Sequence, residues 1–139
     1  MRVMVLIKSD ELAEAGQLPE QEMITGMIKF SEELVEAGVM LAGEGLHPSA
    51  RGAKVNWTGG KVTVVDGPFT ETKEIIAGYW LWQVNSMEEA IEWVKRMPAS
   101  GKQDGTIEIR EIFETAEFGD HMTDEQRERN ERMRAQLGQ

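Results

Sequence analysis

A short stretch between two apolar runs holds most of the residues that could carry chemistry. It reads Asp66-Gly67-Pro68-Phe69-Thr70-Glu71-Thr72-Lys73-Glu74. Asp-Gly favours a turn and proline fixes its own φ, so this loop presents its charged side chains from a restrained backbone. Asp66 is a candidate general base, and Lys73 and Glu74 are candidates for binding a small molecule. The loop is the first place where we expect a functional site.

His47 is the candidate partner of Asp66. It lies in a glycine-containing segment, between Leu46 and Pro48. A histidine side chain exchanges protons near neutral pH, and a carboxylate beside it sets its tautomer and basicity. We therefore predict that His47 and Asp66 form a catalytic pair. The alternatives are a histidine that is only hydrogen-bonded within its loop and an aspartate that caps its own turn.

Four residues are candidates for contacting a substrate: Lys73, Glu74, Arg51 and Tyr79. Lys73 or Arg51 would bind an anion, and Glu74 would accept or donate a proton. A surface ion pair of little energetic value is the alternative for the adjacent Lys73 and Glu74. A solvated loop arginine is the alternative for Arg51. Tyr79 opens an aromatic strand that could line a pocket, although such strands more often form a core or a dimer interface.

Several kinds of site lack the residues they need. Gly43-Glu44-Gly45 has neither the third glycine nor the following helix of a dinucleotide-binding motif. Only two histidines, His47 and His121, occur, and the chain has no cysteine. We therefore expect no metal site and no cofactor, and disulfides and thiolate nucleophiles are excluded.

Composition narrows the class of protein. With 139 residues, 40% hydrophobic and 29% charged, the chain has the size and make-up of one soluble globular domain. Its 25 acidic and 15 basic residues give a net charge of −10, which argues against direct nucleic-acid binding. No apolar run approaches the roughly 20 residues of a membrane helix. We expect a cytoplasmic protein.

Apolar periodicity predicts the elements of the first half. Residues 3–7 are a short β-branched run typical of a strand buried on both faces. Residues 23–35 repeat at helical spacing before Gly38, and residues 39–42 favour a second strand. Thr58-Gly59-Gly60 separates two strand-like runs, at 54–57 and 61–65, and predicts a hairpin that leads into the loop.

The second half repeats this order. Residues 78–84 predict a strand with large residues on both faces, and Ser86 with Glu89 predicts a capping box that starts a helix ending before Pro98. A polar connection over residues 100–105 leads to residues 106–110. Their alternation of apolar and polar side chains predicts a strand with one solvent-exposed face. From Thr123 onward the charged residues predict a solvated helical tail. We divide the chain into a domain at residues 1–118 and a tail at 119–139.

The predicted order, βαβ, a hairpin, then βαβ, indicates an α+β fold of the ferredoxin-like βαββαβ type with an inserted β-hairpin. In that plan both helices cover one face of the sheet. Because two strands carry apolar residues on both faces, the face without helices would expose apolar side chains to water. Burying each large side chain contributes roughly 1.5–3 kcal/mol. We therefore expect a homodimer that packs sheet against sheet as a dimeric α+β barrel.

The motif Asp66-Gly67-Pro68-Phe69, with Glu71, Lys73 and Glu74, resembles the signature of the DGPF branch of the YCII-related family. Blocks at residues 30–39, 45–52, 78–80 and 88–93 are similar to family blocks in the family's order, so the resemblance covers residues 1 to 118. YCII-related proteins in the narrower sense carry a histidine in the first helix. No histidine occurs here between Met23 and Ala37, which leaves His47 for that role.

The resemblance implies a homodimer of ferredoxin-like fold but no settled activity. Our first hypothesis is a small-molecule enzyme that uses acid/base chemistry on a small polar or anionic metabolite near the DGPF loop. The second is a non-catalytic binding or regulatory module associated with an extracytoplasmic-function sigma factor, because the family is often encoded beside such factors. The charged tail suits a docking role. A third possibility is a purely architectural DGPF segment that closes the dimer.

Overall fold

The computed structural model describes residues 1–98 and 104–139. The six strands are β1 (Arg2–Lys8), β2 (Met40–Gly45), β3 (Ala53–Thr58), β4 (Lys61–Asp66), β5 (Ile76–Gln83) and β6 (Ile107–Glu111). The α-helices are α1 (Glu11–Glu14), α2 (Gln21–Glu36), α3 (Met87–Lys95) and α4 (Asp124–Gln136). The described residues also contain three 3₁₀ segments, η1 (Ser49–Arg51), η2 (Thr72–Glu74) and η3 (Thr115–His121). Most of the polar connection predicted at residues 100–105 lies outside the described residues.

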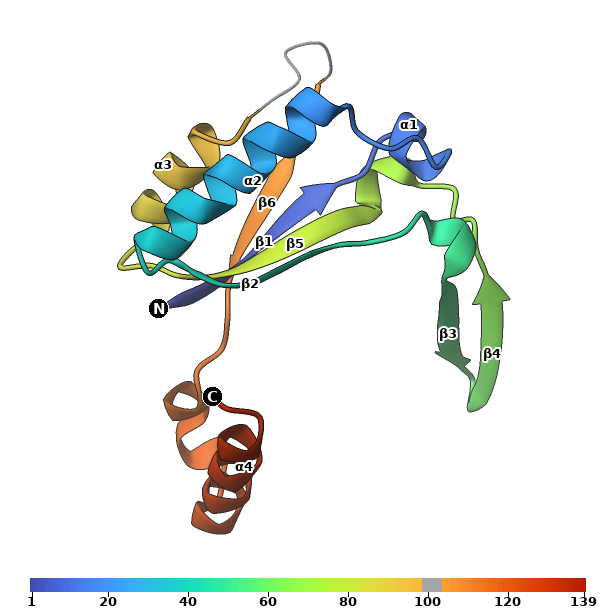
Figure 1. The fold of residues 1–139 in the computed structure, drawn as a ribbon. Helices are drawn as coiled ribbons and strands as arrows, with labels where there is room; N and C mark the ends of the chain where they lie inside the picture. The colour runs from blue at the N-terminus through green and yellow to red at the C-terminus, as the bar shows by residue number, and fades with distance from the viewer. Residues whose placement is uncertain (99–103) are drawn as a thin grey trace.

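Four strands form one antiparallel sheet in the order β2-β5-β1-β6, and β3 and β4 form a separate two-stranded sheet. With α2 after β1 and α3 after β5, this is the predicted βαββαβ order with a hairpin inserted in its middle. Figure 1 shows α2 and α3 on one face of the sheet. The α+β prediction is therefore confirmed for the single chain.

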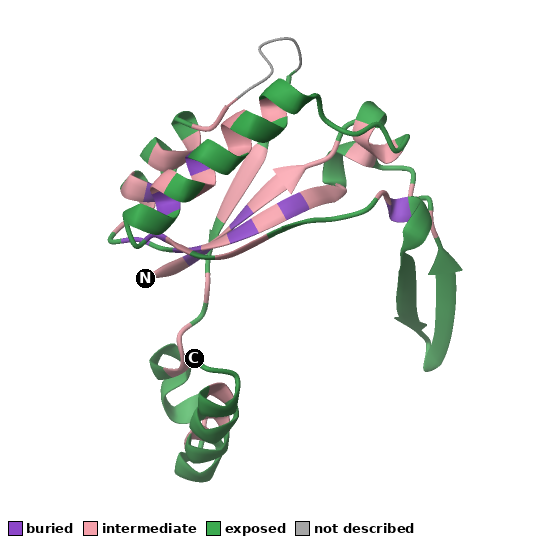
Figure 2. Ribbon diagram, viewed as in Figure 1, coloured by how far each residue is buried: buried purple, intermediate pink, exposed green. Residues whose placement is uncertain are grey.

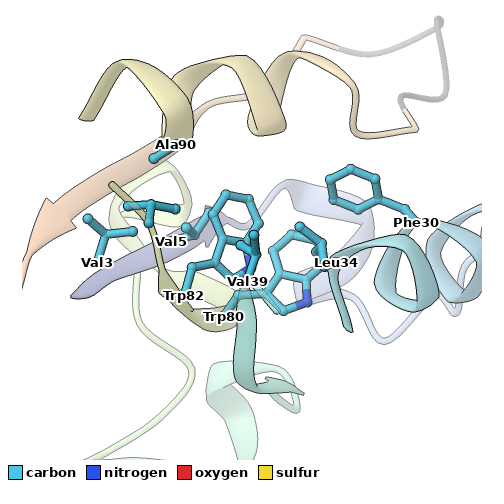
Figure 3. Close-up of a cluster of buried hydrophobic side chains, with 9 residues drawn as sticks. Val3, Val5, Phe30, Leu34, Val39, Trp80, Trp82 and Ala90 are labelled. Atoms are coloured by element: carbon cyan, nitrogen blue, oxygen red, sulfur yellow. The ribbon is translucent and has the colours of Figure 1, made fainter. Parts of the chain in front are cut away.

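The core lies between the sheet and these two helices. Val3 and Val5 of β1 and Trp82 of β5 are completely buried there, and Leu34 of α2 packs with them (Figure 3). The next residues along β1 point to the opposite face and are only half-buried. Strands β1 and β5 therefore each have one buried and one half-buried face in the chain alone, whereas the sequence predicted burial on both.

Helix α3 begins where the capping residues predicted it. Its N-cap is Ser86, whose Oγ accepts a hydrogen bond from the Glu89 backbone N–H at 3.1 Å. The carboxylate of Glu89 accepts from the N–H of Asn85 at 2.7 Å, one residue before the N-cap. The predicted capping box thus forms only its serine half.

The β3–β4 hairpin projects from the sheet and has no buried residue (Figure 2). Gly59 and Gly60 both adopt positive φ, at 57° and 79°, between the paired residues Thr58 and Lys61. Two adjacent positive φ values match the two-residue turn that suits the twist of a hairpin, and glycine adopts them without steric cost. The hairpin prediction is confirmed.

The C-terminal residues form a separate helical unit of η3 and α4, which projects from the opposite end of the sheet (Figure 1). Helix α4 starts after Thr123, as predicted, while η3 was not predicted. Arg2 of β1 anchors the unit, because its Nε donates to Glu114 Oε1 at 3.0 Å. This hydrogen bond lowers the pKa of Glu114. Within the described residues, none of the helices has the length and apolarity needed to cross a membrane.

Candidate functional site

A cavity of about 460 Å³ lies at the base of the hairpin, where two segments distant in sequence meet. One segment runs from the end of β2 through η1 into β3. The other runs from the loop after β4 through η2 into β5. The lining residues are Leu46, His47, Pro48, Ser49, Arg51, Gly52, Lys54, Phe69, Glu71, Glu74, Ile75 and Ile76. The volume falls within the roughly 300–1,000 Å³ typical of small-molecule sites.

Three of the residues predicted for the site line this cavity: His47, Arg51 and Glu74. The Nη1 of Arg51 lies 3.0 Å from Nε2 and 3.3 Å from Nδ1 of His47. A guanidinium only donates hydrogen bonds, so the ring nitrogen that accepts from it carries a lone pair. The fold therefore places the imidazole of His47 directly beside the guanidinium of Arg51.

Among the described residues, Glu74 has one cationic side chain within 4.0 Å. Its Oε2 lies 4.0 Å from Nζ of Lys8, and the same ammonium is 3.7 Å from Oε1 of Glu108. The side chain of Lys8, at the end of β1, is largely buried, whereas that of Glu74 is exposed. The sheet therefore supplies a charge that partly balances Glu74 from outside the cavity lining.

Three other predicted residues lie outside the lining. Asp66 ends β4, exposed and opposite Ala53, and Lys73 is an exposed residue of η2. Tyr79 lies opposite Leu6 in the sheet, half-buried on the face that carries no helix. The catalytic role of Asp66 and the binding roles of Lys73 and Tyr79 stay predictions.

Gly67, which follows Asp66, is required by close backbone packing. A Cβ at this position would lie 1.7 Å from the carbonyl oxygen of Ser49. The N–H of Gly67 also donates to the carbonyl of Gly52 at 3.0 Å, and the peptide bond to Pro68 is cis. Only a residue without a side chain allows the loop to approach η1 this closely. Glycine at this position is therefore explained by tertiary packing against Ser49 as well as by the turn preference of Asp-Gly.

Ser49 joins three segments around the cavity. It is only 7% exposed. Its N–H donates to Oε1 of Glu14 at 2.8 Å, and its Oγ donates to Oε2 of the same carboxylate at 2.5 Å. The Oγ also accepts from the N–H of Phe69 at 2.9 Å. These bonds tie α1 and the loop to η1, and they fix one wall of the cavity against the other.

No local pattern in the sequence indicates this network. Glu14 lies in a one-turn helix too short to show periodicity, although Asp10 caps it by accepting from the N–H of Ala13 at 2.7 Å. Ser49 follows Pro48 in a segment that has no nucleophile motif. Because it is 35 residues from Glu14 along the chain, their contact becomes visible only in the folded protein.

Lys54 and Phe69 are two further lining residues that sequence reasoning missed. The Nζ of Lys54 lies 4.3 Å from the centre of the Phe69 ring, a cation–π contact across the two walls. Phe69 had a signal, because it belongs to the loop motif. Lys54 had none, since a lysine at the start of a hairpin strand is usually solvated.

The lining combines groups that can transfer a proton with groups that can hold a charge. Imidazole and carboxylate side chains, here those of His47 and Glu74, are proton acceptors, and the guanidinium of Arg51 can stabilise negative charge. All three residues are exposed in the single chain, so solvent screens the interactions among them. Among the described residues, no cluster of three or more His, Asp or Glu side chains could hold a metal ion. The arrangement suits acid/base chemistry on a small molecule.

Comparisons with known proteins agree with the resemblance at the level of the family. Residues 1–116 match the family model of the YCII-related domain. An uncharacterized protein of Rhizobium meliloti (strain 1021), R00369, is 27% identical over 110 residues, which cover 78% of this chain and 89% of that protein. A solved structure of 5-chloro-2-hydroxyhydroquinone dehydrochlorinase from Burkholderia phenoliruptrix AC1100, in complex with 2,5-dihydroxybenzoquinone, matches with a TM-score of 0.47. It is 12% identical, and the match covers 84% of this chain and 98% of that one.

Proposed function

The chain belongs to the YCII-related family, and from this premise we propose that it is a small-molecule enzyme using acid/base chemistry in the cavity beside the loop. The motif Asp66-Gly67-Pro68-Phe69 supports a place in the DGPF branch of that family. The observation that carries the proposal is the convergence of His47, Arg51 and Glu74 on one cavity from two distant segments. Loops positioned by a rigid sheet commonly carry such sites.

In this proposal His47 and Glu74 handle protons, and Arg51 holds a substrate group. Glu74 is the carboxylate that transfers a proton, because it lines the cavity whereas Asp66 does not. The position of His47 in the cavity lining, beside the guanidinium of Arg51, supports its role as a base. Asp66 is kept as the competing carboxylate. A comparison of Glu74→Gln with Asp66→Asn decides between the two.

An isotope-exchange assay tests the proposal even while the substrate is unidentified. The protein is incubated in heavy water with pooled small metabolites, and proton NMR detects any C–H position that exchanges for deuterium. We expect at least one metabolite to exchange with the unaltered protein, and a loss of about 10²–10⁴-fold in His47→Gln and Glu74→Gln. Lys61→Gln, at the tip of the hairpin, is the matched control and should exchange normally. Exchange that persists in both cavity variants, or that never occurs, contradicts the proposal.

We also propose that the chain is a homodimer, with the two sheets packed as an α+β barrel. The face of the sheet without helices carries four half-buried apolar side chains, from Met4, Leu6, Tyr79 and Leu81. Figure 1 shows the hairpin and the C-terminal unit projecting on that same side of the sheet. A second copy between them would remove this apolar surface from water.

Sedimentation at micromolar concentration tests the dimer. The unaltered protein should sediment as a dimer, and Leu81→Glu should sediment as a folded monomer because a charge would be buried in the interface. Leu18→Glu is the control, since Leu18 is highly exposed in a loop before α2. A stable, well-behaved single subunit in the unaltered protein would rule out this assembly.

The C-terminal unit favours a second candidate function, a regulatory module that docks a sigma factor. The unit lies almost wholly beyond the family match, projects from the sheet and leaves Met133 of α4 exposed, with exposed Leu137 directly after the helix. Deletion of residues 119–139 tests this role. Loss of sigma-factor capture, with capture unchanged in Glu74→Gln, supports regulation. Capture that survives the deletion removes the tail as its basis.

A further inference from the structure

The two walls of the cavity carry opposite charges. The wall from β2 to β3 presents the side chains of His47, Arg51 and Lys54, and the wall from the loop to β5 presents those of Glu71 and Glu74. These walls come from separate segments of the chain, so the separation of charge is a product of the fold. A ligand with two different ends would bind in one orientation.

The cations of the first wall are not neutralised by carboxylates. Among residues 1–98 and 104–139, no carboxylate oxygen lies within 4.0 Å of the charged nitrogens of Arg51 or Lys54. The guanidinium contacts the ring of His47, and the ammonium lies over the ring of Phe69. Glu74, in contrast, already has Lys8 at 4.0 Å, from outside the lining. In a chain of net charge −10, two such cations beside one cavity favour an external anion.

The rest of the cavity is suited to an apolar body. Three aliphatic side chains, the ring of Phe69 and Pro48 contribute to the lining; the aliphatic residues are Leu46, Ile75 and Ile76. A ligand with several anionic groups would meet the carboxylates of Glu71 and Glu74 in the same volume, and like charges repel. Phosphate esters with two charges therefore fit the site less well than a single oxyanion.

Resting on the proposed function, we propose that the substrate is a small organic monoanion, a carboxylate or a phenolate with an apolar body. Its oxyanion faces Arg51 and Lys54, and its reacting end faces Glu74. Lys54 is the residue that sets this charge specificity. Its ammonium lies against an aromatic ring, and an oxyanion in the cavity would give it a charge-assisted hydrogen bond in addition.

Four probes of similar shape and different charge test the ligand class. Benzoate, para-nitrophenolate, the neutral benzamide and the cationic benzylamine are titrated at low salt and mildly alkaline pH, and amide NMR shifts give affinity and location. We expect at least one of the two oxyanions to bind at residues 46–54 and 69–76 about tenfold or more tightly than benzamide or benzylamine. Benzoate binding alone identifies a carboxylate site, para-nitrophenolate binding alone a phenolate site, and binding of both a general oxyanion site.

The variant Lys54→Met tests the specificity residue, because methionine keeps an unbranched apolar chain and removes the charge. We expect its preference for the oxyanion over benzamide to fall about tenfold, with benzamide affinity unchanged. Lys61→Met is the matched control from the other strand of the hairpin, outside the cavity, and should keep the full preference. Amide spectra of both variants confirm that the fold is retained.

Three results would overturn the ligand class: benzylamine or benzamide binding as tightly as the tighter-binding of the two oxyanions, an unchanged preference in Lys54→Met, or no binding of any probe at the cavity. The proposed function is judged separately by deuterium exchange with metabolites. If deuterium exchange depends on His47 and Glu74 but any of these three results is found, the proposed enzymatic function stands and the oxyanion substrate class is rejected.

Discussion

The four-stranded sheet and the β3–β4 hairpin use similar side chains in opposite ways. Trp82 of β5 is fully buried against α2 and α3, whereas Trp57 of β3 is 75% exposed on a hairpin without a buried residue. The cavity lies where these two regions join. Its walls are held by a few polar contacts and one close backbone approach instead of a continuous core. Stability and function should therefore respond to different substitutions.

The largest expected effect separates the two tryptophans. Trp82→Ala would leave a cavity in the core and lower the free energy of unfolding by about 3–5 kcal/mol. Trp57→Ala removes an exposed tryptophan side chain. In the single chain it should change the free energy of unfolding by no more than about 0.5 kcal/mol. Urea unfolding followed by circular dichroism measures both. Equal losses would show that the hairpin belongs to the cooperative core.

Gly67→Ala tests the junction between the two regions. The added methyl group would overlap the Ser49 carbonyl, so the loop must move away from η1, at a cost of about 1–3 kcal/mol. Gly45→Ala is the control, because a Cβ there meets nothing within 4 Å. Urea unfolding gives the stability, and amide NMR shifts should change at residues 46–54 and 69–76. An unchanged loop would mean that the glycine is not needed for this packing.

Ser49→Ala tests the polar links across the junction. The substitution removes the hydroxyl that donates to Glu14 and accepts from the Phe69 N–H, and we expect a loss of about 1–2 kcal/mol. Hydrogen exchange should increase at α1 and at Phe69. Ser9→Ala removes a hydroxyl from an exposed hydrogen bond and should be nearly neutral. Similar behaviour of the two variants would argue against a structural role for Ser49.

The sequence predicted the sheet region more fully than the junction. Alternating and helical periodicities, together with Gly59-Gly60 and Ser86, identified the six strands, both packed helices and the hairpin, with bounds displaced by a few residues. These signals are local, since each follows from neighbours along the chain. The contact of Glu14 with Ser49 and that of Lys54 with Phe69 arise only when distant segments pack. Three of the six predicted site residues line the cavity. The Ser49–Glu14 contact that holds its walls and the second cation, Lys54, could not be predicted, because both depend on such long-range packing.

The smallest expected effect concerns the C-terminal unit, which is tethered to the sheet by Arg2 and Glu114. The hydrogen bond from Arg2 lowers the pKa of Glu114, so this bond stabilises the folded state above the carboxyl group's unfolded pKa of 4.5. That contribution is lost as the pH falls through the lower folded pKa. The effect should be small because the Glu114 side chain is 47% exposed and screened by solvent.

An acid titration of amide NMR shifts at residues 112–121 measures this tether. In the unaltered protein these shifts should change below about pH 4.5, and Arg2→Gln should move the transition to higher pH. Lys95→Gln is the control, because its partner Glu92 lies in α3, far along the chain from the tether. A transition that does not move in Arg2→Gln would show that another group holds the unit in place.

Crystals soaked with pooled small metabolites test the central claim most directly. The account predicts ordered density in the cavity between Arg51 and Glu74, and no such density in crystals of a doubly altered protein, His47→Gln with Arg51→Gln. Density found only on the exposed face of the hairpin or on the C-terminal unit would contradict it. So would density in the cavity that the double substitution leaves unchanged.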